Sequence, residues 1–406
     1  MTLTIHRGTN EIGGSCVAIS TSSTKILIDM GMPLTYDELS EEEKKEVHTQ
    51  ATTWSKGVSA IFISHYHKDH YGLLVDVPMD IPVYGSAGTK AMFEINAQYS
   101  EKRQPIQHTL HVFPQGEVVT IGDINVTAYT VDHSAYDAYA FLIEAGGKSV
   151  LYSGDIRMHG VKGRLYKNLP QDVDYMILEG TNISRMQKKE LKDKCVLKFQ
   201  DLFEKSIQDL KLNLVWVSGQ NFDRIVQIFR ASQTARKILV VDFYMADCLT
   251  SINELNPNIP SPLTHTNIKV LYGIQDDQES AYKFKNRKIT FEEINNCPYR
   301  YVMLIRPSML NVLRKNLSVE KANMITSIWK GYEDRCKSFF GWIDEMGFNR
   351  HYVHTSGHAD VSSLKTIVKH VNPSTIIPIH TTMKSEFEKV FESEIMVLED
   401  NVSQEL

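Results

Sequence analysis

Ser64-His65-Tyr66-His67-Lys68-Asp69-His70-Tyr71-Gly72 follows directly after the short apolar run Ala60-Ile61-Phe62-Ile63. The apolar run predicts a buried strand, so the polar stretch lies at a strand end and in the turn after it. His65 and His67 are two residues apart, and an extended backbone points both imidazoles the same way. Asp69 and His70 follow on the turn and can reach a second point nearby.

This stretch has the composition of a metal site. Three imidazoles and one carboxylate within six residues suit zinc, or manganese where oxygen ligands complete the set. A solvated His-rich turn is the alternative interpretation. It does not explain why four metal-ligand residues crowd together directly after a buried strand.

The bulk properties of the chain are those of a globular protein. At 406 residues it has room for two or three domains. A hydrophobic content of 42% and a charged content of 23% predict a sizeable core. The formal net charge of -5 argues against a broadly basic surface that coats nucleic acid. It is compatible with a nuclease in which a metal pair and a few lysines hold phosphates.

The cysteines and the first residues indicate a cellular location. The five cysteines are odd in number, scattered and without Cys-x-x-Cys spacing, which predicts reduced thiols in a cytosolic protein. Residues 1–6 lack the basic and apolar regions of a signal peptide, and no apolar run approaches membrane-spanning length. We therefore expect a soluble, cytoplasmic protein without a membrane partner.

Other metal-ligand residues also follow predicted strands. His133 comes after the alternating Val126-x-Ala128-x-Thr130, Asp155 after the strand pattern at 149–153, and His380 after the run at 376–379. A turn aspartate is the alternative for Asp155, but its place after an apolar strand favours a carboxylate that bridges two metals. Glu179 follows the strand pattern at 175–178 and can orient a His or bind the metal shell.

Delivery of these side chains from several strand ends to one rim predicts a single site for two ions. The first ion is assigned to His65, His67 and His133. The second is assigned to Asp69, His70 and His380, with Asp155 between the two.

The stretch His354-Thr355-Ser356-Gly357-His358 places two His around a small loop. The Ser356 hydroxyl and the Gly357 amide can hold a phosphate oxygen, and with His354 they are the predicted phosphate- and RNA-binding residues. His108 and His111 also have a ligand-like spacing, but no partner carboxylate lies in their segment. Structural or surface roles are therefore favoured for them.

The pattern of the chain changes near Asn182. From there, helical patterns alternate with short apolar strands through 301–305, as in an α/β domain with a largely parallel sheet. Short strands return from His351. The helical pattern at 185–209 carries Lys188, Lys189 and Lys192, which can guide a nucleic-acid strand but are better explained as a solvated helix face.

The pattern His65-x-His67-x-Asp69-His70 resembles the signature of the metallo-β-lactamase fold, whose members commonly hold two metals. Nearly the whole chain resembles the β-CASP branch of that fold, especially bacterial ribonuclease J, and the stretches 217–224 and 305–309 resemble parts of its inserted domain. The resemblance implies an α/β protein: a metallo-β-lactamase αββα sandwich from residues 1–183 and 349–406, with an inserted α/β β-CASP domain at 184–348.

The resemblance also implies roles for single residues. Glu179 resembles the first acidic motif of the branch, Ser356-Gly357-His358-Ala359 its catalytic His motif, and His380 its last motif. A His at that last motif goes with RNA substrates. Asp29, at the end of a predicted strand, resembles the aspartate that buttresses the metal loop, with a simple strand cap as the alternative.

Together these features predict a metal-dependent ribonuclease that hydrolyses phosphodiester bonds of single-stranded RNA, internally or from the 5′ end. Two ions about 3.5–4 Å apart, zinc with manganese as the alternative, would lower the pKa of a bound water from about 15.7 towards about 7 for attack on phosphorus. His358 is expected to protonate the departing 3′ oxygen, and Glu179 to orient the His358 ring. Asp69 is the third predicted catalytic residue.

Three alternatives remain open from the residues alone. A DNA nuclease of the same branch is the first, although DNA-cutting members tend to have an apolar residue at the position of His380. A small-molecule hydrolase of the thioesterase or lactonase kind shares the His65 to His70 cluster, but does not need the insert or the loop at 354–358. A non-catalytic RNA-binding scaffold is disfavoured because no expected ligand is missing.

Overall fold

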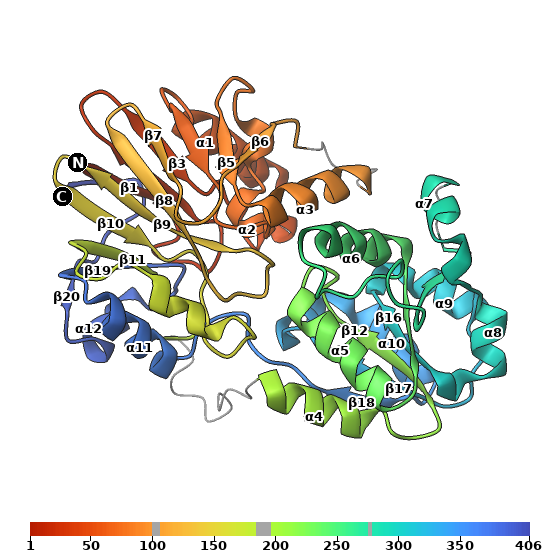
Figure 1. Ribbon diagram of the computed structural model, residues 1–406. Coiled ribbons are helices and arrows are strands. Elements are labelled where there is room, and N and C mark those ends of the chain that lie inside the picture. Colours follow the sequence, from red (N-terminus) through yellow and green to blue (C-terminus); the bar gives the residue numbers. More distant parts are fainter. Residues whose placement is uncertain (100–105, 184–195, 275–277) are drawn as a thin grey trace. The chain divides into compact units, whose positions relative to one another are not determined.

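The computed structural model describes residues 1–99, 106–183, 196–274 and 278–406. The chain divides into two units, which are coloured by sequence in Figure 1. The first unit comprises Met1–Lys192 and Gly357–Leu406, and the second comprises Asp193–Ser356. The chain thus leaves the first unit, forms the second and returns.

The first unit contains two seven-stranded sheets. In the first sheet, β1, β2 and β3 are antiparallel neighbours, β3 to β6 run parallel, and β21 pairs antiparallel with β1. Its strands, in spatial order, are β21 (Ser403–Glu405), β1 (Thr2–Arg7), β2 (Cys16–Ser20), β3 (Lys25–Ile28), β4 (Ala60–Phe62), β5 (Val83–Gly85) and β6 (Leu110–Val112).

The second sheet of this unit is parallel over β20, β19, β11 and β10 and antiparallel over β10, β9, β8 and β7. Its strands, in spatial order, are β20 (Glu394–Ile395), β19 (Thr375–Ile379), β11 (Tyr175–Glu179), β10 (Lys148–Tyr152), β9 (Tyr139–Ala145), β8 (Ile124–Thr130) and β7 (Val118–Ile121).

The core of the first unit lies between these sheets. Alternate residues of β1 and β8 point inward, so that Leu3 and Ile5 pack in the same buried cluster as Ile124 and Val126. Helices lie beside the two sheets, with α1 to α3 near the first and α11 and α12 near β19 and β20 (Figure 1). This is the predicted αββα sandwich, and the fold prediction is confirmed.

Helix α11 illustrates why these segments are helical. Its N-cap Asp360 accepts a hydrogen bond from the Ser363 amide, and its residues Leu364, Ile367 and Val371 form one buried face. The helices of this unit are α1 (Glu41–Trp54), α2 (Lys68–Tyr71), α3 (Ala87–Gln98), α11 (Val361–Val371) and α12 (Phe387–Val390), with short 3₁₀ turns at Tyr36–Glu38, Leu74–Asp76, Gly163–Asn168 and Lys384–Glu386.

The second unit is built on one seven-stranded sheet in which all neighbours run parallel. Its central strands are buried along their whole length, as expected for a sheet covered on both faces. The strands, in spatial order, are β15 (Lys288–Ile289), β14 (Ile268–Leu271), β13 (Ile238–Val241), β16 (Tyr301–Ile305), β12 (Leu212–Trp216), β17 (Ala322–Thr326) and β18 (Asn349–Tyr352).

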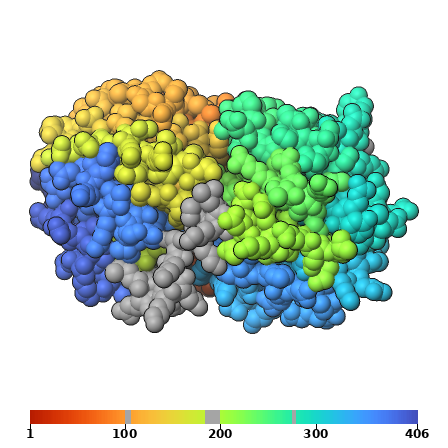
Figure 2. All heavy atoms as spheres, turned by 60° about the horizontal axis from the view of Figure 1, so that its bottom comes forward, coloured from red at the N-terminus to blue at the C-terminus, as the bar shows by residue number. Residues whose placement is uncertain are grey.

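Seven helices belong to the described part of this unit. Two of them, α4 and α5, pack against each other, and α4 is visible in yellow-green in Figure 2. The helices are α4 (Val196–Ser206), α5 (Phe222–Thr234), α6 (Phe243–Leu255), α7 (Gln278–Lys283), α8 (Phe291–Asn296), α9 (Leu310–Asn316) and α10 (Lys337–Glu345), with 3₁₀ turns at Lys285–Arg287, Pro298–Arg300, Pro307–Met309, Lys330–Tyr332 and Asp334–Cys336.

Some details at the junctions differ from the sequence pattern. Strand β18 pairs with β17 in the sheet of the second unit, although the predicted boundary at 348/349 assigns it to the first. The predicted boundaries at 183/184 and 348/349 stay predictions. Lys188, Lys189 and Lys192 lie outside the described residues. Within the described ranges, no helix has the length and apolarity that a membrane crossing requires.

Candidate metal centre

Three neighbouring strands of the second sheet deliver polar residues to one edge. Asp155 follows β10, Glu179 is the last residue of β11, and His380 follows β19. These strands run parallel, and Glu179 pairs with Ile379, so their carboxyl ends meet at the same edge. His133 follows β8, which points in the same direction as β10 because both are antiparallel to β9.

The first sheet contributes the segment after β4. His65 lies in the connection, His67 is the N-cap of α2, and Asp69 and His70 lie in that helix. The backbone of residues 30–32, which follows β3, fixes α2 in place: the amides of Met30 and Met32 donate to the carbonyls of His70 and Lys68. Gly31 allows this close approach, since a Cβ at that position would collide with the carbonyl of Asp69.

His65, His67 and His133 form the first cluster. Nδ1 of His67 lies 3.1 Å from Nε2 of His65 and 3.2 Å from Nε2 of His133. Burial lowers the pKa of all three imidazoles, to about 4 for His67, and the neighbouring imidazoles lower the pKa of His65 further. The three rings are therefore neutral at pH 7, and neutral nitrogens are the form that binds a metal.

Asp69, His70, Asp155 and His380 form the second cluster, and their ligand atoms lie within 4.8 Å of one another. Burial disfavours the charge on His70, but the carboxylates of Asp155, Asp29 and Asp69 together raise its pKa well above the usual value. Burial likewise disfavours the charge on Asp69, but His70 and His380 lower its pKa to about 2. The concentrated negative charge at this point favours a cation.

The Asp155 carboxylate connects the two clusters. Its Oδ2 lies 3.8 Å from Nε2 of both His65 and His133, and 3.2 Å from Nε2 of His70. Its Oδ1 lies 3.7 Å from Nε2 of His380 and, within the described residues, has no hydrogen-bond partner although it is buried. An unsatisfied buried carboxylate oxygen is costly, and a bound cation would remove that cost.

Three of the imidazoles, those of His133, His70 and His380, are oriented by a partner on the far side of the ring. Nδ1 of His133 donates to the Gly357 carbonyl at 2.8 Å, and Nδ1 of His70 donates to Asp29 Oδ2 at 2.7 Å. The Thr181 hydroxyl lies 2.8 Å from Nδ1 of His380. These contacts leave the Nε2 atoms facing the clusters, as in metal sites where the second ring nitrogen is held by an oxygen.

Asp29 holds the segment after β4 in place. Its Oδ1 accepts from the Ser64 amide, and its Oδ2 accepts from the Ser64 hydroxyl and from the Tyr152 hydroxyl, all at 2.8 Å. Its backbone has a φ of 60°, and that of His380 has a φ of 54°. Such left-handed conformations are tolerated by Asp and His in particular and cluster at functional sites.

His358 lies beside the two clusters. Its Nδ1 is 3.4 Å from Glu179 Oε1 and 3.8 Å from Asp155 Oδ2, and its backbone carbonyl accepts a hydrogen bond from the side-chain Nδ2 of Asn182. Burial disfavours the charged ring, but the carboxylates of Glu179 and Asp155 raise its pKa to about 9. His358 also belongs to two groups of side chains that can meet at one ion, one with His133 and Asp155 and one with Glu179 and His380.

The structure brings together most of the predicted site residues. All seven predicted ligands lie in the two clusters of the first unit, and Glu179, Gly357 and His358 lie next to them. His354 and Ser356 belong to the second unit. Their role in phosphate binding, and that of the seven side chains as ligands, stay predictions.

Several residues that contact the clusters were not predicted from the sequence. Thr181 contacts both His380 and His358, and Tyr152 donates to Asp29. The Asn182 side chain holds the backbone at His358 and Ala359. Thr181 and Asn182 directly follow the Glu179-Gly180 pair, and only that position after a strand end could have pointed to them.

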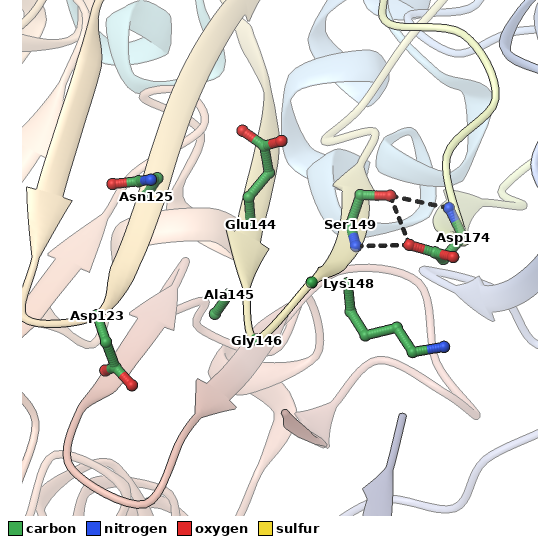
Figure 3. Close-up of a pocket in the computed structure, with 9 residues that line it drawn as sticks. Asp123, Asn125, Glu144, Ala145, Gly146, Lys148, Ser149 and Asp174 are labelled. Carbon is green, nitrogen blue, oxygen red and sulfur yellow. Dashed lines mark hydrogen bonds between the residues drawn. The ribbon is translucent and has the colours of Figure 1, made fainter.

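A separate hollow lies at the other end of the second sheet. It has a volume of about 440 Å³ and is lined by the turns around Asp123 and Gly146, with Lys148, Ser149 and Asp174 (Figure 3). Asp174 Oδ2 accepts hydrogen bonds from the amide and hydroxyl of Ser149. Because β10 begins here and Asp155 lies beyond its other end, this hollow is distinct from the clusters.

Comparison with known families agrees with this fold. A family model described as a beta-lactamase superfamily domain matches residues 24–240, and one described as a Zn-dependent metallo-hydrolase RNA specificity domain matches residues 345–394. The first match spans more than half of the sequence, so the chain belongs to the metallo-β-lactamase superfamily. Both matches, with the relatives below, assign it to the β-CASP branch of ribonuclease J-like proteins.

The curated relatives have names that refer to RNA cleavage or processing. The chain is 34% identical to Ribonuclease J of Sinorhizobium meliloti over 102 residues, which are 25% of this chain and 18% of that protein. It is 27% identical to Probable RNase MJ4 of Methanocaldococcus jannaschii over 194 residues, 42% of this chain and 43% of that protein. It is 23% identical to Integrator complex subunit 11 of Gallus gallus over 93% of this chain and 68% of that protein.

The chain therefore spans less than half the length of the first two of these relatives. Among solved structures, a protein of unknown function from Enterococcus faecalis V583 matches with a TM-score of 0.82 and 17% identity, over 99% of both chains. This likeness shows that the fold is shared.

The contacts of Asp29 lead to a first prediction. Asp29→Asn keeps the side-chain shape and tolerates the left-handed backbone, but it loses the charge that orients His70. We expect metal affinity to fall by about 10–100-fold, as for other groups that support a metal-binding His. The measurement is the metal retained by the full chain during titration with a chelator.

Tyr152→Phe is the matched control, because it removes one of the donors to Asp29 and leaves the His70 contact in place. It should retain metal more strongly than Asp29→Asn. Equal metal retention by Asp29→Asn and the wild type would refute a supporting role for Asp29.

Proposed function

We propose that the chain is a metal-dependent ribonuclease that hydrolyses phosphodiester bonds in single-stranded RNA. The observation that carries the proposal is the position of Asp155, whose Oδ2 is within 3.8 Å of nitrogens from both clusters. This arrangement is suited to two ions that share one carboxylate. The RNA specificity model that matches residues 345–394, and relatives named as ribonucleases, support RNA as the substrate.

The donor sets fit divalent metals. The first cluster offers only imidazole nitrogens, which suit zinc, and the second adds carboxylate oxygens, which suit zinc or manganese. His65, His67 and His133 would hold one ion and Asp69, His70 and His380 the other, with Asp155 shared. When bound, such a pair supplies an activated water at neutral pH and stabilises negative charge on phosphoryl oxygens.

The residues beside the clusters would complete the reaction. His358 would donate a proton from its ring to the departing 3′ oxygen, and Glu179, at 3.4 Å, would orient that ring. Asn182 donates a hydrogen bond to the backbone carbonyl of His358 and so fixes the position from which the His358 side chain extends. His354, Ser356 and Gly357 would bind phosphate groups of the RNA strand.

The proposal includes the domain organisation and the setting of the enzyme. Residues 184–348 would form the inserted β-CASP domain, to which the pairing of β18 with β17 adds residues 349–352, and residues 1–183 would form the sandwich with the rest of 349–406. The cysteines Cys16, Cys248, Cys297 and Cys336 are free thiols, which supports a reducing, cytoplasmic location.

The first test removes single ligands. We expect His65→Ala and Asp155→Ala each to lower cleavage of a single-stranded RNA by at least about 10³-fold, because the activated water depends on both ions. The measurement is the initial rate on an end-labelled RNA, with single-stranded DNA and duplex RNA of the same sequence alongside.

His108→Ala is the control, since His108 belongs to neither cluster and, within the described residues, its Nε2 bonds to the Pro78 carbonyl at 3.1 Å. It should cleave at the wild-type rate. Circular dichroism must show that every variant is folded. Wild-type rates in folded His65→Ala and Asp155→Ala would overturn the proposal, and preferential cleavage of DNA would overturn the RNA assignment.

The second test separates a proton donor from a metal ligand. We expect His358→Ala to lower kcat on RNA by about 10²–10⁴-fold while both ions stay bound, since positioned acids contribute that much. On a phosphodiester with a p-nitrophenolate leaving group, which needs no proton, the loss should be far smaller. Metal content and both rates are measured on the same preparation. Loss of an ion from His358→Ala would instead make His358 a ligand.

A further inference from the structure

Three exposed aromatic side chains gather in the second unit, and we call them the aromatic platform. Trp329 is 48% exposed, Tyr332 is 40% exposed and Tyr352 is 41% exposed. Large aromatic side chains are ordinarily mostly buried, whereas at least two fifths of each of these three residues is exposed. An exposed group of this kind marks a binding surface.

The platform lies at the carboxyl ends of the strands, which is where ligands bind in parallel α/β structures. Strands β17 and β18 run parallel, and Thr326 pairs with Tyr352 as the last pair of the two strands. Trp329 and Tyr332 follow β17 within six residues, so all three rings come from the carboxyl ends of these strands.

The rings have fixed orientations. The centroids of Trp329 and Tyr332 are 5.8 Å apart, with ring planes at 88°. The indole lies directly over Gly331, where a Cβ would collide with the ring atoms of Trp329. The ring of Tyr352 lies 5.9 Å from that of His354, one of the residues assigned above to phosphate binding.

Cationic side chains are interleaved with these rings. Lys330 Nζ lies 4.8 Å from the ring centroid of Tyr352, and the Arg335 guanidinium carbon lies 5.8 Å from that of Tyr332. Arg350, on β18, is paired with Glu333 at 2.9 Å. Aromatic faces alternating with cations match a polymer in which flat bases alternate with phosphates.

We infer that the aromatic platform stacks unpaired bases of the RNA strand. The inference rests on the proposed function and adds a binding subsite formed by Trp329, Tyr332 and Tyr352. Stacking on aromatic rings requires bases whose faces are free, which a duplex does not offer. The platform therefore selects single strands by their chemistry, whatever their sequence.

Tryptophan fluorescence tests this inference directly. The chain has four tryptophans, and Trp54, Trp216 and Trp342 are only 5%, 8% and 3% exposed, so quenching by a stacked base reports on Trp329. We expect a single-stranded oligouridylate to quench the emission of the full chain in EDTA, which prevents cleavage. An abasic oligonucleotide with the same number of phosphates, and an RNA duplex, should leave it unchanged.

Affinity of labelled oligouridylate, followed by anisotropy, tests the single rings. Trp329→Leu and Tyr352→Leu keep an apolar side chain but lose the ring, and each should weaken binding at least about fivefold. Tyr282→Leu is the matched control, because Tyr282 is 72% exposed and has Lys285 Nζ 3.9 Å from its ring. It should bind like the wild type.

The two proposals fail in different ways. Active RNA cleavage without quenching, or with equal affinity in all three variants, overturns the platform alone. Quenching by oligouridylate in a chain that cleaves no RNA overturns the ribonuclease alone. Equal quenching by abasic and uridylate strands would show that phosphates, and not bases, occupy the surface. Absence of all oligonucleotide binding, with a protein partner retained instead, would also refute the inference.

Discussion

The Oδ2 atom of Asp155 lies 3.2 Å from a ring nitrogen of His70 and 3.8 Å from one of His133, in a side chain that is 2% exposed. A carboxylate so deeply buried is stable only if positive charge or hydrogen-bond donors compensate for its lost hydration. Burial disfavours its charge, but His380, His70 and His358 hold its pKa well below the usual value. The rest of the site is arranged around this charge.

The fold makes that arrangement possible by joining two sheets. Parallel strands of the second sheet deliver Asp155, Glu179 and His380 from one edge, and the segment after β4 delivers the others. Support for the rings then comes from backbone and side chains far along the sequence, such as the Gly357 carbonyl at His133. The return of the chain at residue 357 therefore supports the ring of His133.

Much of this site could be predicted from local patterns. Apolar strands followed by His or Asp are visible at His65, His133, Asp155 and His380, because a strand has a simple period and ends abruptly. Their convergence could be inferred from the shared edge of a sheet. The resemblance to the β-CASP branch supplied the sandwich and its insert, and the family comparison confirms both the branch and the fold.

The remaining contacts depend on packing that no local pattern encodes. Thr181 reaches His380 across 199 residues of sequence, and Tyr152 reaches Asp29 across 123. The loop at 354–358 reads as one motif in the sequence, yet its first residues belong to the second unit and its last to the first. The sequence likewise did not show to which unit strand β18 belongs, because a short strand pairs with whichever sheet the tertiary structure places beside it.

The central claim is that one carboxylate is shared by two ions. Anomalous diffraction from crystals of the protein purified without added metal or chelator tests it most directly. The account predicts two peaks about 3.5–4 Å apart, one beside His65, His67 and His133 and the other beside Asp69, His70 and His380, both in contact with Asp155. A single peak, or two peaks of which one lies away from Asp155, would contradict it.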